Sequence, residues 1–224
     1  SEGLSRRLAA RMIEQAKRPL ILIGAGGNRK LVSKMLKHFV EKTGIPFFNT
    51  QLGKGVIDER HPLYLGTASL TENDCVHSAV CQSDLIINIG HDVIEKPPFI
   101  MRENGHKVIH VNFSSAKVDQ IYFPHHEVVG DIANAVWQIS EKIVVQAHWN
   151  FSHFLAVKKS FSKDAENLAD NSCFPLRASN IVAEVRRIMP DDGIVALDNG
   201  MYKIWFTRNY QAFASNTLLV DNSL

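Results

Sequence analysis

The sequence predicts an α/β fold with a doubly wound parallel sheet, because apolar strand segments alternate with helical segments along most of the chain. The first strand segment, residues 20–23, is short and continuously apolar, as is typical of strands that are buried on both faces. A glycine-rich stretch, LILIGAGGN at residues 20–28, marks the first turn from strand to helix. The predicted strands cover residues 20–23, 45–48, 84–90, 107–113 and 127–130.

Helical periodicity fills the gaps between these strands. A helix with an apolar face over residues 31–40 stops near Gly44, and another helix covers about 72–81. Asp131 is a good N-cap for a helix that reaches about residue 145. The N-terminal segment is also helical, and the apolar positions that share one of its faces are Leu4, Leu8, Met12, Ile13 and Ala16.

The chain divides into three parts. Residues 1–146 form the first α/β domain, and residues 147–176 have no clear period, which indicates a connector with a helical piece. The pattern restarts in residues 177–224, with a helix followed by strands at 194–197 and 217–220. Two strands do not form a sheet that could stand alone. We therefore expect an incomplete second α/β unit that packs on the first domain or on a neighbouring chain.

Composition excludes several classes of protein. Hydrophobic residues make up 45% of the chain, charged residues 21%, and the net charge is +2, so nothing favours binding to nucleic acid or to an acidic membrane. No apolar stretch approaches the roughly 20 residues needed to span a bilayer. The cysteines Cys75, Cys81 and Cys173 are odd in number and lack zinc or redox spacing. Reduced thiols in a cytoplasmic protein are the expectation.

The glycine-rich turn matches a dinucleotide fingerprint only in part. Gly24 and Gly26 fit the first two glycines of G-x-G-x-x-G, but Arg29 stands at the third. The second strand ends in Asn49 and Thr50 rather than in the acidic residue that would bind a ribose. An NAD site is therefore not predicted.

Ligands of open α/β sheets still bind at the carboxyl ends of the strands, near helix N-termini. That rule leaves a candidate nucleotide site, for which the alternative is that the glycines only permit tight turns. The candidate residues at these strand ends are Gly24, Ala25, Gly26, Thr50, Leu52, Gly90 and Asp131.

Other reactive clusters favour ordinary structural roles. His91 and Asp92 lack a nucleophile within sequence reach, and the adjacent histidines of the run 125–127 would point to opposite faces of an extended chain. Lys54 lacks the flanking pattern of a phosphate-binding loop, so a loop role is expected. The aromatic residues predicted as core or interface anchors are Trp205, Phe206 and Tyr210.

The order of the segments resembles that of the thiamine diphosphate-dependent enzymes, and within them the large, catalytic subunits of acetolactate synthases. Residues 1–146 are similar to the family's central domain, and LDNGMYKIWFTRNY at 197–210 lies in a segment, 177–224, that resembles the start of the cofactor-binding C-terminal domain. The stretches that carry the first likeness are RPLILIGAGG, GIPFFNTQLGKGVIDERHPLYLG, SDLIINIG, KVIHVNF and VVGD.

This resemblance implies a reaction that joins two pyruvate molecules and releases carbon dioxide, with thiamine diphosphate as the electron sink. In the family an activating glutamate comes from an N-terminal domain, and a later aspartate and asparagine motif holds Mg2+ and the diphosphate. Neither element is expected in this chain, so no catalytic residue and no metal ligand is predicted, and the chain alone should be inactive. By similarity, Asn199, Gly200 and Met201 lie where the family meets the cofactor's diphosphate.

The resemblance also bears on flavin and on assembly. The biosynthetic branch holds FAD along the strand ends, with an arginine after the strand that ends in Gly90; here Arg102 comes only later, which resembles the FAD-free, catabolic branch. The family implies a homo-oligomer, a dimer or a tetramer, and leaves a regulatory subunit open. The alternatives are another thiamine diphosphate-dependent 2-oxoacid decarboxylase or carboligase, and a non-catalytic nucleotide-binding module.

Overall fold

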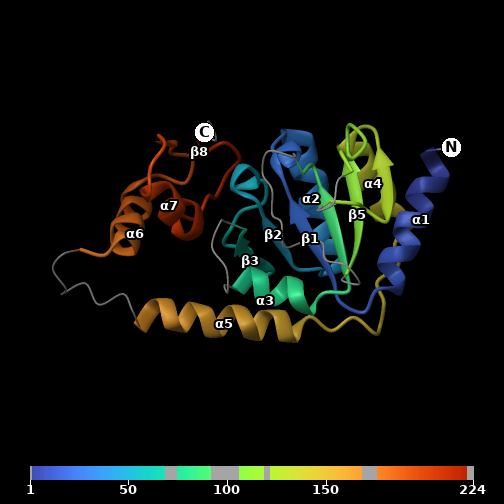
Figure 1. Cartoon of the computed structure of the whole chain (residues 1–224), viewed down its shortest axis with the longest axis horizontal. Helices are drawn as coiled ribbons and strands as arrows, with labels where there is room; N and C mark the ends of the chain where they lie inside the picture. The colour runs from blue at the N-terminus through green and yellow to red at the C-terminus, as the bar shows by residue number, and fades with distance from the viewer. Residues whose placement is uncertain (1, 69–74, 92–105, 119–121, 168–175, 221–224) are drawn as a thin grey trace.

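The computed structural model describes residues 2–68, 75–91, 106–118, 122–167 and 176–220 (Figure 1). Its main body is a parallel sheet of six strands in the order β3-β2-β1-β4-β5-β6, as the alternating pattern predicts. The strands are β1 (Pro19–Ile23), β2 (Phe47–Asn49), β3 (Tyr64–Thr67), β4 (Leu85–Ile89), β5 (Lys107–Asn112) and β6 (His126–Val129).

Helices cover both faces of this sheet, which makes it doubly wound. Side chains alternate along β1, so that Ile21 and Ile23 join one hydrophobic cluster while Leu20 and Leu22 join the other. The first cluster includes α1 (Glu2–Gln15), α2 (Lys30–Thr43) and α4 (Ile132–Lys142). The second includes α3 (Cys75–Gln82) and α5 (Ser152–Asn167), which lies in the expected connector and buries Phe154 against the sheet.

The helix ends follow the predicted signals. Gly44 has a φ of +69° and closes α2, with its N–H donating to the carbonyl of Val40. The side chain of Asp131 accepts a hydrogen bond from the N–H of Asn134 and caps α4. Among the described residues, no helix is long and apolar enough to cross a membrane.

Three local predictions differ from the structure. The edge strand β3 is absent from the predicted strands, because its four residues carry no alternating pattern and include Gly66. β2 begins two residues later than predicted, because Ile45 and Pro46 lead into it. On α1, Leu4 and Leu8 are 67% and 47% exposed. The helix instead buries small residues, Ala9 and Ala10, which let it approach α4 closely.

A smaller unit follows α5, at the left of Figure 1. It consists of α6 (Ala178–Ile188), β7 (Val195–Leu197), α7 (Tyr202–Asn209) and β8 (Leu218–Val220), and β7 pairs in parallel with β8. Its core is a cluster of Val182, Leu197, Tyr210 and Leu218. We call these elements the C-terminal unit.

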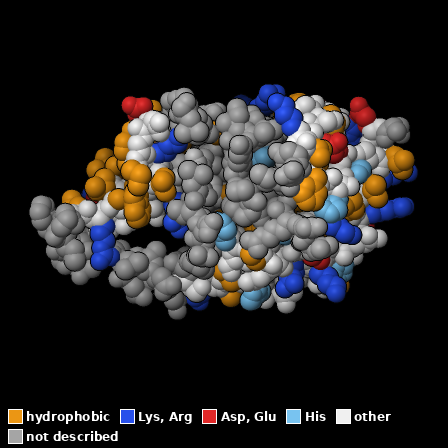
Figure 2. All heavy atoms as spheres, viewed as in Figure 1, with side chains coloured by type: hydrophobic (Ala, Val, Ile, Leu, Met, Phe, Trp, Pro, Cys, Tyr) orange, Lys and Arg blue, Asp and Glu red, His pale blue; other side chains and the backbone are white. Residues whose placement is uncertain are grey.

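The C-terminal unit contacts the main body, which confirms that the tail packs on the first domain. The N–H of Ala212 donates to the carboxylate of Glu59, and the hydroxyl of Ser215 donates to the carbonyl of Gly55. The unit also exposes apolar surface: hydrophobic side chains gather around α6 in Figure 2, and Ile188 and Ile194 are more than half exposed. A sheet of two strands is too small to be stable alone, and its helices leave part of the unit's apolar surface exposed.

Candidate functional site

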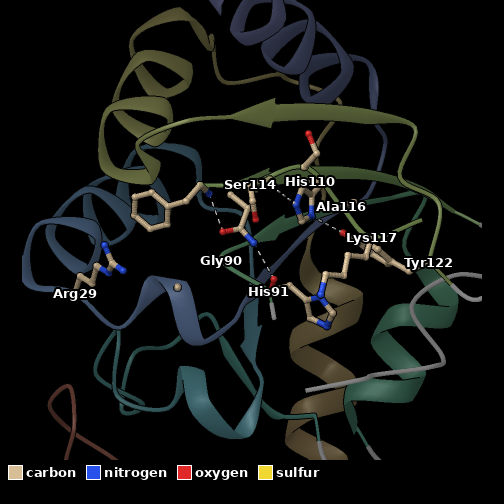
Figure 3. A pocket seen from close by; sticks show the side chains of 12 residues that line it. Arg29, Gly90, His91, His110, Ser114, Ala116, Lys117 and Tyr122 are labelled. Carbon is tan, nitrogen blue, oxygen red and sulfur yellow. Dashed lines mark hydrogen bonds between the residues drawn. The ribbon is translucent and has the colours of Figure 1, made fainter. Parts of the chain in front are cut away.

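A pocket opens at the carboxyl end of the main sheet, where the strand order reverses between β1 and β4. The connections diverge at such a switch point and leave a crevice in which ligands of α/β sheets bind. The pocket, shown in Figure 3, has a volume of about 400 Å3. It is lined by Gly26 and Arg29 after β1, by Gly90 and His91 after β4, by residues 112–117 at and beyond the end of β5, and by His110 and Tyr122.

The glycine turn after β1 uses its backbone N–H groups inside the protein. A phosphate held at a strand-to-helix turn needs N–H groups that point at it. Here five donors between residues 24 and 29 already have an acceptor within the protein, so these five are not available to a phosphate. The hydrogen bonds run from Gly24 to Ile89 (2.8 Å), Gly26 to Gly90 (2.7 Å), Gly27 to Gly24 (2.9 Å), Asn28 to Ala25 (3.0 Å) and Arg29 to Gly27 (2.8 Å).

Close packing explains why these positions are glycine. A Cβ atom on Gly24 would lie 2.6 Å from the Cα of His91, and one on Gly26 would lie 2.9 Å from the Cα of Gly90. Gly90 has a φ of +69°, and a Cβ there would lie 2.5 Å from the backbone nitrogen of Gly27. The turns after β1 and β4 therefore touch backbone to backbone, which only glycine permits.

Side chains supply the charge of the pocket. The guanidinium of Arg29 lies 4.4 Å from the ring centroid of Phe113, and Lys117 projects from the segment after β5. None of the described residues that line the pocket is acidic. The pocket therefore has a positive potential, and this potential comes from two long, adjustable side chains rather than from a fixed backbone cradle.

Neutral side chains form the floor of the pocket. The Nε2 of His110 lies 3.1 Å from the carbonyl oxygen of Ser114. A carbonyl can only accept, so Nε2 carries the proton, and Nδ1 accepts from the hydroxyl of Tyr122 at 2.9 Å. That hydroxyl in turn accepts from the amide of Asn88 at 2.6 Å. Burial lowers the pKa of His110 and raises the pKa of Tyr122, which keeps both groups neutral at neutral pH.

The other strand-end candidates do not line this pocket. The hydroxyl of Thr50 accepts from the N–H of Gly53, and the carbonyl of Leu52 accepts from the side chain of Asn28. The carbonyl of Ala25 accepts from the backbone of Asn28, and Asp131 caps α4. Of the seven candidates, Gly26 and Gly90 line the pocket. Asp92 and Arg102 fall outside the described residues, as does Cys173.

The second predicted turn, at residues 199–201 after β7, has a different character. The N–H of Asn199 donates to the carboxylate of Asp198 at 2.7 Å. The carbonyls of Gly200 and Met201 accept from the first turn of α7. For the N–H groups of Gly200 and Met201, no acceptor is found among the residues that the structure describes. Met201 is 77% exposed. The two donors lie at the start of a helix, where an anion is favoured.

One buried charged pair was not predicted. Lys54, expected in an ordinary loop role, places its Nζ 2.9 Å from Oε2 of Glu59, and both side chains are almost fully buried. The sequence carries no clear local signal for this burial, because Glu59 stands between Asp58 and Arg60 in a charged run. A buried charge needs a partner, but its burial is visible only in the folded chain.

The remaining histidines have structural partners. Nδ1 of His125 accepts from the N–H of Val108, and His126 lies 3.1 Å from the hydroxyl of Ser5. The carboxylate of Glu127 accepts from the N–H of Ala116. Within the described part of the chain, no group of three or more His, Cys, Asp or Glu residues is placed to hold a metal ion.

Comparison with known proteins identifies the fold. Residues 7–139, more than half of the chain, match the family described as "Thiamine pyrophosphate enzyme, central domain". The chain belongs to the thiamine pyrophosphate enzymes. Thiamine pyrophosphate is another name for thiamine diphosphate, so the match confirms the family predicted from the sequence.

Individual relatives extend the similarity beyond the central domain. An acetolactate synthase of Bacillus subtilis is 28% identical over 216 residues, which is 95% of this chain and 38% of the relative. A probable acetolactate synthase large subunit of Methanococcus aeolicus is 24% identical over 96% of this chain and 39% of its own length. A pyruvate oxidase of Lactiplantibacillus plantarum is 25% identical over 92% of this chain and 34% of its own length. The chain thus spans less than two fifths of these relatives.

The described residues could hold the diphosphate of thiamine diphosphate, but they include no ligand cluster for its metal ion. The turn at 199–201 offers two N–H donors, which suit the diphosphate of thiamine diphosphate. No cluster of metal ligands accompanies it among the described residues. For FAD, five backbone donors of the glycine turn are already bonded within the protein, so these five are not available to a dinucleotide's pyrophosphate.

Proposed function

We propose that this chain is the central domain and the first part of the cofactor-binding domain of an acetolactate synthase, which converts two pyruvate molecules into 2-acetolactate and carbon dioxide. The similarity to acetolactate synthases over at least 95% of the chain carries this proposal. It extends past residue 139, the limit of the central-domain match, into the C-terminal unit.

The chain contributes structure and one cofactor contact to that reaction. Thiamine diphosphate, when bound with Mg2+, supplies the electron sink for decarboxylation. Gly200 and Met201 would donate their N–H groups to its diphosphate, with Asn199 shaping the turn beside them. The main sheet would hold this turn in place. Since no catalytic group is assigned to the chain, residues 1–224 alone should be inactive.

We also propose that the enzyme works without FAD. Five N–H groups of the glycine turn already donate hydrogen bonds within the protein, which supports this proposal. A flavin dinucleotide in this fold needs such backbone donors for its pyrophosphate. A second candidate, a nucleotide-binding module, draws support from the positive pocket lined by Arg29 and Lys117. The two proposals differ in whether an adenine nucleotide binds the isolated chain.

The proposed function also implies an oligomeric state and a cellular location for the protein. An acetolactate synthase of this type would be a homo-oligomer, a dimer or a tetramer, with a regulatory subunit left open, and would act on pyruvate in the cytoplasm. The exposed apolar side chains of the C-terminal unit, such as Ile188 and Ile194, are consistent with further burial in the assembled enzyme.

Product analysis tests the proposal. The complete protein that contains this chain is incubated in air-saturated phosphate buffer with pyruvate, thiamine diphosphate and Mg2+, and acetolactate is measured as acetoin after acid treatment. Acetolactate from the complete protein, and none from purified residues 1–224, is the expected result. Acetaldehyde as the product would identify a decarboxylase instead. Acetyl phosphate with oxygen uptake would identify an oxidase, and either outcome would overturn the assignment.

Ligand binding tests the absence of flavin. Purified residues 1–224 are incubated with FAD and then desalted, and the retained absorbance near 450 nm is measured. We expect none. Retained flavin, or an adenine nucleotide that binds at micromolar concentration in calorimetry, would favour the nucleotide-binding module.

A further inference from the structure

The joint between the main body and the C-terminal unit is built around the buried pair of Lys54 and Glu59. Their side chains are 1% and 0% exposed. Removing two charges from water costs several kcal/mol for each ion, so a buried pair adds little stability compared with apolar residues of the same size. Such a pair does fix geometry, because each of its hydrogen-bonding atoms needs a partner in a defined place.

The carboxylate of Glu59 joins segments that are far apart in the sequence. Its Oε2 accepts from Lys54 at 2.9 Å and from the N–H of Ala212 at 2.9 Å. Its Oε1 accepts from the side chain of Asn49 at 2.8 Å and from the N–H of Gly55 at 3.4 Å. The backbone N–H of Glu59 also donates to the carbonyl of Ala212 at 3.2 Å. Glu59 thus holds both backbone groups of Ala212.

The other end of the network is anchored in the sheet. Lys54 donates a second hydrogen bond, at 3.0 Å, to the hydroxyl of Thr67, the last residue of β3. That hydroxyl donates in turn to the side chain of Asn49, the last residue of β2, at 2.7 Å. Tyr64 contacts both side chains, and burial raises its pKa, so its hydroxyl stays protonated. The position of Glu59 is therefore set by two strands.

An outer layer of contacts at the same joint is weaker. Arg60 pairs with Asp58 and with Asp191 and lies 4.0 Å from the ring centroid of Phe213. These charged side chains are 38% to 66% exposed, and exposed ion pairs contribute little to stability. The specificity of the joint therefore rests on the buried pair.

α7 connects this joint to the turn at 199–201. The helix has eight residues, Tyr202–Asn209, and so is about 12 Å long. Residues 199–201 precede its first turn, and Ala212 follows it by three residues. A displacement of Ala212 would therefore move the whole helix and the turn at its other end.

We propose that Lys54 and Glu59 form a latch that holds the end of α7 and so sets the position of the 199–201 turn relative to the main sheet. Glu59 is a positioning residue in this scheme, because it acts through Ala212 and α7. The latch itself does not depend on which reaction the protein catalyses. Only its effect on cofactor binding rests on the proposed function.

Hydrogen exchange of residues 1–224 tests the latch directly. In Glu59→Gln the side chain keeps a single acceptor oxygen, which cannot serve Ala212, Lys54 and Asn49 together. Exchange in peptides from residues 202–218 should become at least tenfold faster, while β1 and β4 keep the protection of the parent chain. Equal acceleration in both regions, or no change in either, would show an ordinary core pair and overturn the latch.

Two further variants make the result specific. Ala212→Pro removes the donor on the C-terminal side and leaves the Lys54 and Glu59 pair intact. It should reproduce the selective exchange even if Glu59→Gln fails to fold. Glu184→Gln makes the same chemical change in an exposed pair on α6, and its exchange should stay within twofold of the parent chain. An Ala212→Pro chain without faster exchange in 202–218 would contradict the proposal.

The effect on the cofactor is measured in the complete protein by calorimetry with thiamine diphosphate and Mg2+. Glu59→Gln should weaken binding about tenfold, with the maximal rate at saturating cofactor changed less than threefold. Unchanged affinity together with selective exchange would keep the latch and refute its link to the cofactor. Because this readout is binding, it remains valid if the complete protein makes a product other than acetolactate.

Discussion

In the two strand-to-helix turns of this protein, the number of glycines and the number of available N–H donors differ in opposite directions. The turn after β1, with glycines at 24, 26 and 27, resembles a phosphate cradle, yet five of its N–H groups, those of residues 24 and 26–29, are engaged within the protein. The turn after β7 has one glycine, and the N–H groups of Gly200 and Met201 lack an acceptor among the described residues. Glycine content reports how closely backbones approach, whereas anion binding depends on which donors remain available.

A glycine-to-alanine substitution in the first turn should strongly destabilise the fold. In Gly24→Ala the new Cβ would lie 2.6 Å from the Cα of His91, and backbone atoms cannot move aside as a side chain would. We expect a loss of about 3 kcal/mol in the free energy of unfolding, measured with urea. Gly3→Ala is the control, because nothing lies within 4 Å of its Cβ. A Gly24→Ala protein as stable as Gly3→Ala would refute the backbone contact.

In the second turn the effect on stability should be small. A Cβ on Gly200 would approach only the ring of Tyr202, which is 44% exposed and can rotate away. We expect Gly200→Ala to cost less than about 1 kcal/mol in urea unfolding. In the complete protein it should weaken thiamine diphosphate binding, because the ring or the backbone must shift at the donors. Full cofactor affinity in this variant would argue against the 199–201 turn as the diphosphate contact.

Acid should lower the stability of the protein through His110, in the pocket beside the first turn, by less than either glycine substitution does. Burial lowers the pKa of His110 from its ordinary 6.5, so the unfolded chain takes up a proton at a higher pH than the folded chain. The contribution of His110 to stability is complete above about pH 6.5 and is lost as the pH falls toward its folded pKa. Thermal melts from pH 7.5 to 5 should show a shallower decline in His110→Gln than in the parent chain.

A control separates His110 from the other histidines. Burial also lowers the pKa of His61, so part of the decline should persist in His110→Gln. His38, exposed on α2, can be changed to Gln without a buried group being touched. If His110→Gln and His38→Gln decline alike, the buried imidazole does not contribute to the acid sensitivity.

Local signals predicted most of the fold. Segments rich in apolar and β-branched residues mark buried strands, so the predicted limits of β1, β4, β5 and β6 agree with the structure to within one residue. Gly44 and Asp131 ended and began their helices, since caps act within a few residues. β3 was missed because an edge strand of four residues with Gly66 has no period to detect. Its pairing with β2 comes from the sheet that it joins.

The site was less predictable than the fold. Arg29, Phe113 and Lys117 come from two separate turns, and only strand order brings them to one pocket. The Lys54 and Glu59 pair lies within six residues, but its third partner, Ala212, is more than 150 positions away. No periodicity connects such residues, because the hydrogen bonds depend on the packing of α7 against the main body.

The sequence by itself determined the alternation of strands and helices, the family, and the position of the two candidate turns, because these depend on side-chain pattern and local backbone preference. Only the tertiary structure decided which turn keeps its N–H groups available and which buried charge finds a partner. Both outcomes depend on the atoms that surround a group, and the folded chain draws those atoms from distant parts of the sequence.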